Sequence, residues 1–354
     1  MFGTKKIRVA INGAGRIGRA FLKVALERKE LEVVAINDLA NIDNIAYLLK
    51  YDTAYGKSPF EVHAYHDETA RKQDQLIING QRINYTQGAE PKNLPWMALK
   101  VDVVVESTGF FTSPEKAKGH LDAGAKRVVI SAPAKETEDL STGVKCETVL
   151  MGINEDNLKD CVVSSNASCT TNAGSPLIAI LNETIGIEKA LLNTVHGYTA
   201  SQSLVDGPSK KDFREGRAAA QNLVPSSTGA TVSVTKALPD LKGKFDGISI
   251  RVPVVVGSIV DVTFVAKRDT SVEEVNSILK KAATEDRWKN IFTVTEEQLV
   301  SSDIVGSHYA SIADLNFTRV VGGNLVKVLA WYDNEMGYTY TLVDHVIKSG
   351  SLIK

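Results

Sequence analysis

The feature that most constrains this chain is a run of strand, glycine-rich turn, helix and strand within its first 38 residues. Ile7–Ile11 is an apolar strand candidate, followed by GAGRIG at 13–18, a helical stretch over about 19–29 and a second strand candidate over Leu31–Ile36. This order predicts a βαβ unit, because G-x-G-x-x-G is the spacing of the turn that opens the helix of such a unit. Asp38 follows the second strand, 20 positions past the last glycine.

Each part of this unit has a physical role in binding a dinucleotide. Gly13 permits the tight turn, Gly15 lets a pyrophosphate approach the backbone, and Gly18 allows the helix to pack closely on the strand. The amides at the helix start bind phosphate. Asp38 is expected to accept hydrogen bonds from the adenosine ribose and to repel a 2′-phosphate. We therefore predict NAD and not NADP as the cofactor, with a purely structural glycine turn as the alternative.

The rest of the first half alternates strand and helix candidates. Strand candidates cover 101–106 and 127–131, with a helical stretch at 114–123 between them. This alternation predicts an α/β fold with an N-terminal Rossmann-type, doubly wound parallel sheet, whose ligand lies at the carboxyl ends of the strands. Thr108, Gly109 and Ser131 occupy such ends. They are candidates for cofactor binding, with an ordinary turn residue as the alternative for each.

Beyond about Cys169 the pattern changes to long apolar runs that follow one another. These strand candidates lie at 248–256, 259–266 and 325–331, with helical stretches near 272–283 and 344–348. Strands that run into strands predict a mostly antiparallel sheet with helices on one face, which makes the second half an α+β domain. The polar stretch 65–75 is expected to be a solvated connection.

Composition narrows the class of protein. The chain has 354 residues and a formal net charge of −1. That length favours two domains, and the near-neutral charge argues against a protein that coats nucleic acid or an anionic membrane. Three cysteines without C-x-x-C spacing predict no disulfide framework and no zinc site, and they fit a reducing compartment. Because we find no signal-peptide core and no apolar run that could span a bilayer, we expect a cytoplasmic protein without a metal.

Cys169 is the candidate nucleophile. It lies in a run of hydroxyl residues, shortly before the apolar helical stretch Leu177–Leu181. A helix start exposes a cysteine to unpaired amides and to the positive end of the helix dipole, which predicts a lowered pKa for its thiol. Pro176 leaves two alternatives: a helix that begins just after Cys169 and bends at the proline, or one that begins at Ser175.

His196 is the candidate base for this nucleophile. It lies at the end of a short β-like run, NTVHGYT, over 193–199. A hydrogen-bonded structural histidine is the alternative for His196 alone, and a small buried apolar residue is the alternative for Cys169. The combination of the two with a cofactor motif favours catalysis. Cys146 and Cys161, which lack such neighbours, are expected to be buried apolar residues.

At this point the sequence resembles the phosphorylating glyceraldehyde-3-phosphate dehydrogenases almost from end to end. SCTTN, at 168–172, is the most specific of the blocks that match. In order along the chain, the blocks are INGAGRIGR (11–19), AINDLA (35–40), YDTAYG (51–56), ESTGFF (106–111), ISAPAK (130–135), SNASCTTN (165–172), HGYTASQ (196–202), GRAAAQNLVPSSTGA (216–230), RVPVV (251–255) and WYDNEMGY (331–338).

The resemblance implies a reaction and assigns residues to it. The reaction is the NAD-dependent, phosphorylating oxidation of D-glyceraldehyde 3-phosphate to 1,3-bisphosphoglycerate in glycolysis and gluconeogenesis. In that family the cysteine matching Cys169 attacks the aldehyde to give a hemithioacetal, the histidine matching His196 takes the proton, and phosphate cleaves the thioester. The residues implied for binding the two phosphates are Arg251 and Thr199 on one side, and Ser168, Thr170, Thr228 and Gly229 on the other. Those implied for the cofactor are Gly13, Gly15, Arg16, Ile17, Gly18, Asp38, Thr108, Gly109, Ser131, Asn334 and Tyr338.

The same resemblance implies an organisation into domains and subunits. Residues 1–168 would form the NAD-binding domain and 169–333 the catalytic domain, while 334–354 would return to the NAD-binding domain. A homotetramer is expected, with 207–217 contributing to the cofactor pocket and to subunit contacts. Neither a membrane nor a nucleic acid is expected as a partner.

The chain departs from the family pattern at Ala14, Ala89, Ala173, Ser201, Glu215 and Met336. Of these, Ala89 and Glu215 put contacts to the adenine and to phosphate in doubt.

Two rival functions stay open. An erythrose-4-phosphate dehydrogenase is disfavoured because Thr199 and the pair Thr228-Gly229 are present. A nucleotide- or RNA-binding protein with secondary catalysis is disfavoured because no basic stripe with interleaved aromatics is found.

Overall fold

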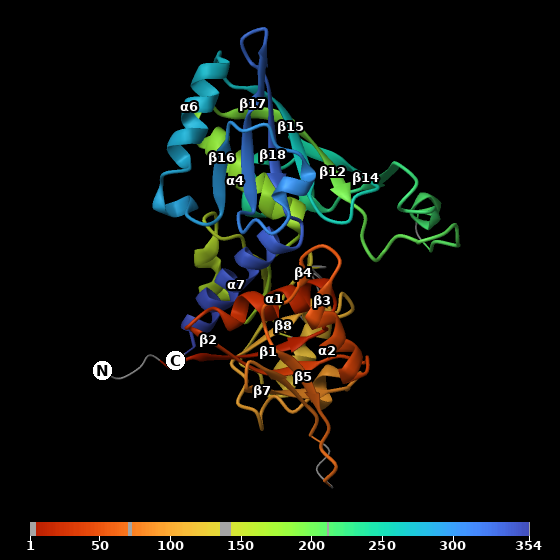
Figure 1. The fold of residues 1–354 in the computed structure, drawn as a ribbon. Coiled ribbons are helices and arrows are strands. Elements are labelled where there is room, and N and C mark those ends of the chain that lie inside the picture. The colour runs from red at the N-terminus through yellow and green to blue at the C-terminus, as the bar shows by residue number, and fades with distance from the viewer. Residues whose placement is uncertain (1–4, 70–72, 135–142, 211, 354) are drawn as a thin grey trace. The chain divides into compact units, whose positions relative to one another are not determined.

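The computed structural model describes residues 5–69, 73–134, 143–210 and 212–353. Lys135, which ends the ISAPAK block, and Lys211 lie outside the described residues. The chain divides into two compact units (Figure 1). Unit 1 comprises Met1–Val149, Glu155–Ala167 and Leu342–Lys354, and unit 2 comprises Leu150–Asn154 and Ser168–Thr341.

Unit 1 contains a nine-stranded, mostly parallel sheet in the order β10-β11-β9-β8-β1-β2-β7-β6-β5. The antiparallel pairs in it are β5 with β6 and β6 with β7. The sheet strands are β1 (Ile7–Asn12), β2 (Leu31–Asn37), β5 (Val62–Tyr65), β6 (Gln75–Ile78), β7 (Gln81–Thr86), β8 (Val103–Glu106), β9 (Arg127–Ile130), β10 (Cys146–Thr148) and β11 (Val163–Ser165), with β3 (Tyr51–Asp52) and β4 (Gly56–Lys57) forming a separate ribbon. The sequence order reverses at β1, whose neighbours are β2 and β8, and ligands of such sheets bind outside the carboxyl ends of the strands at this point.

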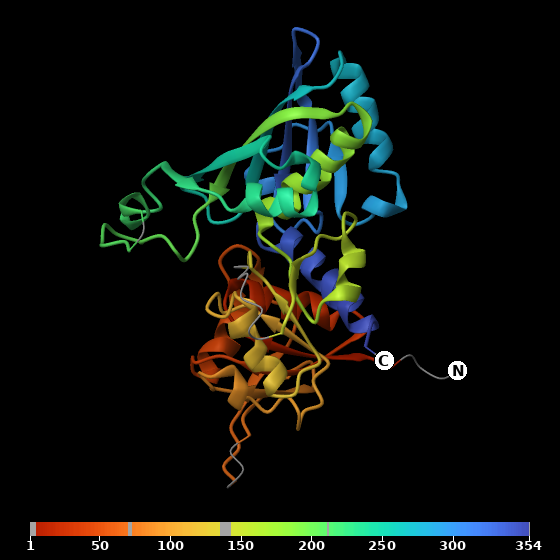
Figure 2. The same cartoon turned by 180° about the vertical axis from the view of Figure 1, so that it is seen from behind.

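The helices of unit 1 are α1 (Arg16–Leu26), α2 (Ile42–Lys50) and α3 (Pro114–Asp122). Figure 1 has α1 and α2 in front, whereas Figure 2, seen from behind, has the yellow-orange α3 in front, so the sheet carries helices on both faces. Helix α1 begins three residues earlier than predicted, because the extended Gly15 already acts as its N-cap. The predicted doubly wound sheet is confirmed.

Unit 2 contains a seven-stranded, mostly antiparallel sheet in the order β13-β14-β12-β15-β18-β17-β16. Its strands are β12 (Ile187–Gly197), β13 (Val224–Ser227), β14 (Phe245–Val252), β15 (Ser258–Ala266), β16 (Phe292–Thr295), β17 (Ser311–Val321) and β18 (Leu325–Tyr332). Helix α4 (Cys169–Thr184) contacts β12, β15, β17 and β18, while α5 (Ala230–Ala237) contacts β14 and α6 (Val272–Ala282) contacts β16 and β17. Along β15 buried and half-buried residues alternate, as expected for a sheet with helices on one face.

Strand β14 and helix α7 differ most from their predicted bounds. Strand β14 covers Phe245–Val252 and not 248–256, because Pro253 has no amide to continue the ladder. Helix α7 covers Met336–Ser351 and not only 344–348. Within this helix, the residues up to Thr341 belong to unit 2 and those from Leu342 onward belong to unit 1. The predicted return to the NAD-binding domain is at 334. The domain boundaries therefore stay a prediction.

Candidate active site

Cys169 is the first residue of α4, so the first of the two predicted helices is the one that forms. Ser168 is its N-cap: the Ser168 Oγ accepts a hydrogen bond from the Thr171 amide at 3.1 Å. Pro176 lies inside the helix, which is buried along most of its length. The local sequence favours this start because a serine N-cap satisfies an amide that the first turn leaves without a partner.

The backbone immediately before the cysteine is in a rare conformation. Ala167 has φ of +55°, in the left-handed region that alanine seldom adopts, and its side chain is fully buried. The amide of Ala167 donates to Ser165 Oγ at 3.0 Å, which helps to hold this conformation. Strained backbone of this kind clusters at active sites, where the surrounding structure holds it in place.

The pairing register of unit 2 brings His196 beside Arg251. Strands β12 and β14 run parallel, and His196 pairs directly with Arg251. Paired residues project to the same face of a sheet. The two side chains meet there, with Arg251 Nη1 2.6 Å from His196 Nδ1. The sequence separates these residues by 55 positions, so only the register could bring them together.

Cys169 and His196 are in contact. The Cys169 Sγ lies 3.3 Å from His196 Nε2, close enough for the imidazole to take the thiol proton. Burial raises the pKa of the Cys169 thiol, although the charge of Arg251 and hydrogen bonds from Thr170 act in the other direction. The lowered pKa predicted from the helix start was therefore wrong. Desolvation raises the pKa of this thiol by more than the hydrogen bonds at the helix start lower it. The thiol therefore needs a base to become a thiolate.

His196 is the base that faces this thiol. Burial and the neighbouring charge of Arg251 lower the pKa of His196 to about 3, so its imidazole is neutral at pH 7. Its Nδ1 lies 2.6 Å from the Gly197 carbonyl oxygen and 2.6 Å from Arg251 Nη1. One nitrogen cannot donate to the carbonyl and accept from the guanidinium at once. In the tautomer that donates to Gly197, Nε2 carries no proton and faces the thiol.

Tyr332 is a member of this site that the sequence did not single out as a functional residue. Its ring packs edge-on against the His196 imidazole, with 5.9 Å between the ring centroids. Its hydroxyl lies 2.9 Å from Thr170 Oγ1 and 2.8 Å from Thr194 Oγ1. Burial raises the pKa of Tyr332, which keeps the phenol neutral. The tyrosine belongs to the block WYDNEMGY, but no local pattern indicates that β18 carries it to the cysteine.

The residues predicted to bind phosphate lie at element ends in unit 2. Thr199 follows β12, and its hydroxyl lies 2.9 Å from Ser201 Oγ. Thr228 follows β13 and accepts from the Ala230 amide at 3.2 Å. Gly229 is the N-cap of α5, where no side chain caps the helix. The backbone amides in the first turn of α5 can thus donate hydrogen bonds to an anion.

The cofactor turn of unit 1 meets the demands of the βαβ motif. Gly13 has φ of +96°, and a Cβ there would lie 2.8 Å from the Thr108 amide nitrogen. A Cβ at Gly18 would lie 1.9 Å from the Gly13 oxygen, so the protein itself requires these two glycines. At Gly15 a Cβ would meet nothing within 4 Å, and the open side of this turn is where a pyrophosphate would approach.

Asp38 is fixed at the end of β2 beside this turn. Its Oδ2 accepts from the Ala14 amide at 2.6 Å and its Oδ1 from the Ala40 amide at 2.9 Å. A carboxylate has about four acceptor positions, so it can still accept hydroxyl protons from a ribose. These features fit a dinucleotide.

The other predicted cofactor residues are placed as follows. Arg16, in the first turn of α1, forms an ion pair with Asp52 at 2.8 Å, and Ile17 follows it. Thr108 and Gly109 follow β8, and Ser131 follows β9. In unit 2, Asn334 Oδ1 accepts from Ser258 Oγ at 2.9 Å and from the Gly257 amide at 3.1 Å. This orientation leaves Asn334 Nδ2 as the donor toward a ligand. Tyr338 is buried in α7.

Comparison with known proteins identifies the family. The family model described as the NAD binding domain of glyceraldehyde 3-phosphate dehydrogenase matches residues 7–114, and the model of its C-terminal domain matches residues 168–334. Glyceraldehyde-3-phosphate dehydrogenase 1 of Kluyveromyces lactis is 44% identical over 341 residues, which cover 96% of this chain and 98% of the relative. The enzyme of Clostridium pasteurianum is 45% identical, over 95% of this chain and 96% of the relative, and enzyme 1 of Trichormus variabilis is 46% identical, over 96% and 95%.

The chain belongs to the glyceraldehyde-3-phosphate dehydrogenase family. The predicted resemblance is confirmed across almost the whole length of the chain. Within this family the Rossmann unit is an NAD-binding domain, as the glycine-rich turn predicted.

One departure from the family pattern has a clear structural setting. Glu215 accepts a hydrogen bond from Ser226 Oγ at 2.7 Å. Ser226 belongs to β13, the strand that leads into Thr228 and Gly229. The carboxylate is therefore tied to the strand beside the predicted phosphate residues, where it adds a negative charge.

In the described part of the chain, no helix is long and apolar enough to cross a bilayer. Among these same residues, no group of three or more histidine, cysteine, aspartate or glutamate side chains is placed to hold a metal ion.

Proposed function

We propose that this chain catalyses the NAD-dependent, phosphorylating oxidation of D-glyceraldehyde 3-phosphate to 1,3-bisphosphoglycerate. The observation that carries the proposal is the 3.3 Å contact between Cys169 Sγ and His196 Nε2 at a helix start, in a chain of this family. The reaction runs through a hemithioacetal and a thioester on Cys169.

The first step is attack by the Cys169 sulfur on the aldehyde carbon. His196 takes the thiol proton at Nε2, the ring nitrogen that lies 3.3 Å from the Cys169 sulfur. The hemithioacetal oxygen needs a hydrogen-bond donor, and the Cys169 amide at the start of α4 is the group we assign to it. Oxidation of the hemithioacetal requires a two-electron acceptor, which is the chemistry that bound NAD supplies.

Two anion sites serve the substrate phosphate and the attacking inorganic phosphate. Arg251, with Thr199, supports one of them, because a guanidinium offers a fork of donors suited to phosphate. Ser168, Thr170, Thr228 and Gly229 support the other with neutral donors. In unit 1, Asp38 and the turn 13–18 would hold the adenosine end of the cofactor.

The test measures NADH formation from glyceraldehyde 3-phosphate and NAD, with and without phosphate, in the wild type and in Cys169→Ser. We expect rapid, phosphate-dependent turnover in the wild type and a rate lower by about a thousandfold or more in the variant, because a serine hydroxyl is a far weaker nucleophile. Turnover that survives in Cys169→Ser would contradict the thioester route. Faster oxidation of erythrose 4-phosphate, or RNA binding by a folded but inactive wild type, would favour one of the rival functions.

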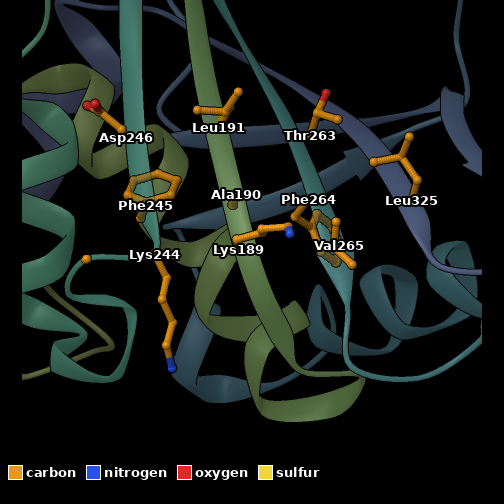
Figure 3. Close-up of a pocket in the computed structure, with 11 residues that line it drawn as sticks. Lys189, Ala190, Leu191, Lys244, Phe245, Asp246, Thr263, Phe264, Val265 and Leu325 are labelled. Carbon is orange, nitrogen blue, oxygen red and sulfur yellow. The ribbon is translucent and has the colours of Figure 1, made fainter.

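Self-association is the second part of the proposal. On the sheet face that α4 leaves uncovered, Leu191 and Leu325 are 65% and 42% exposed and lie beside Thr263 and Val265 of β15 (Figure 3). Contiguous exposed apolar surface of this kind marks an interface between proteins. It supports self-association of this chain, and the family resemblance implies that the assembly is a homotetramer, which we place in the cytoplasm.

Analytical ultracentrifugation tests this assembly. We expect Leu191→Glu to shift the wild-type tetramer to smaller species, because a charge is costly to bury in an apolar interface. Met97, an apolar residue of unit 1 that is 72% exposed, supplies the matched control Met97→Glu, which we expect to remain tetrameric. An unchanged mass for Leu191→Glu would move the interface elsewhere.

A further inference from the structure

A buried carboxylate lies at the carboxyl end of β8, beside the predicted cofactor turn of unit 1. Glu106 ends β8 and is only 1% exposed. Its Oε1 accepts from the Thr108 amide at 2.8 Å and from the Thr108 hydroxyl. Its Oε2 lies 2.6 Å from Asn12 Nδ2 and 3.1 Å from His120 Nε2. Four donors therefore surround one buried charge.

Trp96 fixes the direction of the hydrogen bond between His120 and Glu106. An indole N–H can only donate, and Trp96 Nε1 lies 2.9 Å from His120 Nδ1. His120 Nδ1 must accept, so a neutral His120 carries its proton on Nε2 and donates it to Glu106. The Glu106–His120 contact is thus a hydrogen bond from a neutral imidazole. The negative charge of Glu106 is stabilised by these donors together.

The same network reaches the ends of the neighbouring strands. Asn37 Nδ2 donates to Asn12 Oδ1 at 2.7 Å, which joins β2 to β1. Ser107 Oγ donates to the Gly13 oxygen at 2.8 Å. Gly13 also lies so close to the Thr108 amide nitrogen that a Cβ at Gly13 would be 2.8 Å from it. A shift of the turn 107–109 would therefore displace the glycine-rich turn as well.

We propose that Glu106 is a positioning residue for cofactor binding, because it fixes both the backbone and the hydroxyl of Thr108. The Thr108 hydroxyl donates to Glu106 and accepts from the Phe110 amide at 3.1 Å. It therefore faces a ligand only as an acceptor, which selects a ribose hydroxyl or a carboxamide amide over an anionic oxygen. This inference rests on the proposed binding of NAD.

A double-mutant cycle on NAD affinity tests the proposal. We expect Glu106→Gln to raise the Kd for NAD about tenfold, equal to about 1.4 kcal/mol, because an amide group must face some of these donors with hydrogens of its own. Thr108→Val removes the hydroxyl and should raise the Kd by a similar factor. The double variant should bind less weakly than the product of the two single effects, because both changes act on the Thr108 hydroxyl while only Glu106→Gln also loosens the Thr108 backbone.

Two conservative variants serve as controls. His120→Gln keeps a donor toward Glu106 and an acceptor toward Trp96, and Thr108→Ser keeps the hydroxyl. Both should bind NAD within about twofold of the wild type. If Glu106→Gln does not fold, Thr108→Val against Thr108→Ser still measures the hydroxyl that Glu106 is proposed to orient, and equal binding of NAD by these two variants would overturn the proposal.

The outcomes separate this inference from the proposed function. A wild type that binds no NAD would overturn the proposed function. A wild type that binds NAD while folded Glu106→Gln or Thr108→Val binds equally well would overturn the role of Glu106 alone. Additive effects in the double variant would assign to Glu106 a purely structural part. Circular dichroism and thermal unfolding of each variant report its folding.

Discussion

Two buried histidines in different units have similar surroundings and different chemistry. His196 in unit 2 and His345 in unit 1 are both almost fully buried, and burial together with a nearby arginine lowers the pKa of each to about 3. The arginines are Arg251 and Arg127. A lowered pKa therefore does not by itself identify a base in this protein.

The difference lies in the atoms that the two rings face. His345 Nδ1 lies 3.1 Å from Asn166 Oδ1, which can only accept, and Nε2 lies 2.8 Å from Ser164 Oγ, which must then donate. Both ring nitrogens are committed to structural partners. His196 Nε2 faces the Cys169 thiol, a group that can lose a proton. The chemistry of a buried histidine is thus decided by its partner.

The largest expected effect comes from replacing each histidine in turn. His196→Asn should lower kcat by about 10²- to 10⁴-fold, the usual loss when a general base is removed. His345→Asn should leave kcat almost unchanged and lower the free energy of unfolding by about 1–3 kcal/mol, because buried partners lose their hydrogen bonds. Steady-state rates and urea unfolding of both variants provide the measurement. Equal losses of kcat would break the comparison.

The two arginines should differ in the same way, with smaller effects. Arg251→Lys should lower kcat/KM for glyceraldehyde 3-phosphate by about 10- to 100-fold, because the charged fork suited to phosphate is lost. Arg127 instead donates to Ser349 Oγ at 2.9 Å and to the carbonyls of Leu158 and Cys161. Arg127→Lys should therefore reduce the urea midpoint and spare kcat/KM. A catalytic defect in folded Arg127→Lys would contradict this assignment.

The last prediction concerns the pH dependence of stability. Because the folded-state pKa of His345 is about 3 and its ordinary value is 6.5, the unfolded chain binds the proton first as the pH falls. Stability from the neutral ring is fully present above about pH 6.5 and is lost toward pH 3, by at most about 1.4 kcal/mol per pH unit. Urea unfolding between about pH 7 and about pH 4, where a histidine of the unfolded chain takes up its proton, should give a shallower fall in His345→Asn than in the wild type. Parallel curves would show that His345 does not titrate in this way.

Much of the fold was predictable because its signals are local. The strand 7–11, the turn 13–18 and Asp38 lie within one βαβ unit, and each has a sequence pattern with a known physical cause. Helix α7 was predicted too short because Gly337 and Gly350 weaken a helix. In the structure both glycines are needed: a Cβ at Gly337 would lie 2.4 Å from the Tyr309 oxygen, and one at Gly350 would lie 2.6 Å from Ile7.

Sequence reasoning singled out two members of the candidate site, but it missed a third and the energetics of the cysteine. Cys169 and His196 were singled out from local patterns and from the family resemblance. The pKa of Cys169 was predicted in the wrong direction, because a helix start is a local property whereas desolvation sums over every element that surrounds the thiol. Tyr332 was missed as a site residue for the same reason, since it reaches the site from a distant strand.

The sequence by itself determined the βαβ cofactor motif and the alternation of strand and helix that follows it, and it singled out the candidate pair Cys169 and His196. These depend on glycine conformations, apolar periodicity and residue chemistry, all of which act over short stretches of chain. Only the tertiary structure decided the register that joins His196 to Arg251, the partners of each buried histidine and the network around Glu106. Those features depend on which distant residues become neighbours and on how much water is excluded between them, and no local pattern specifies either.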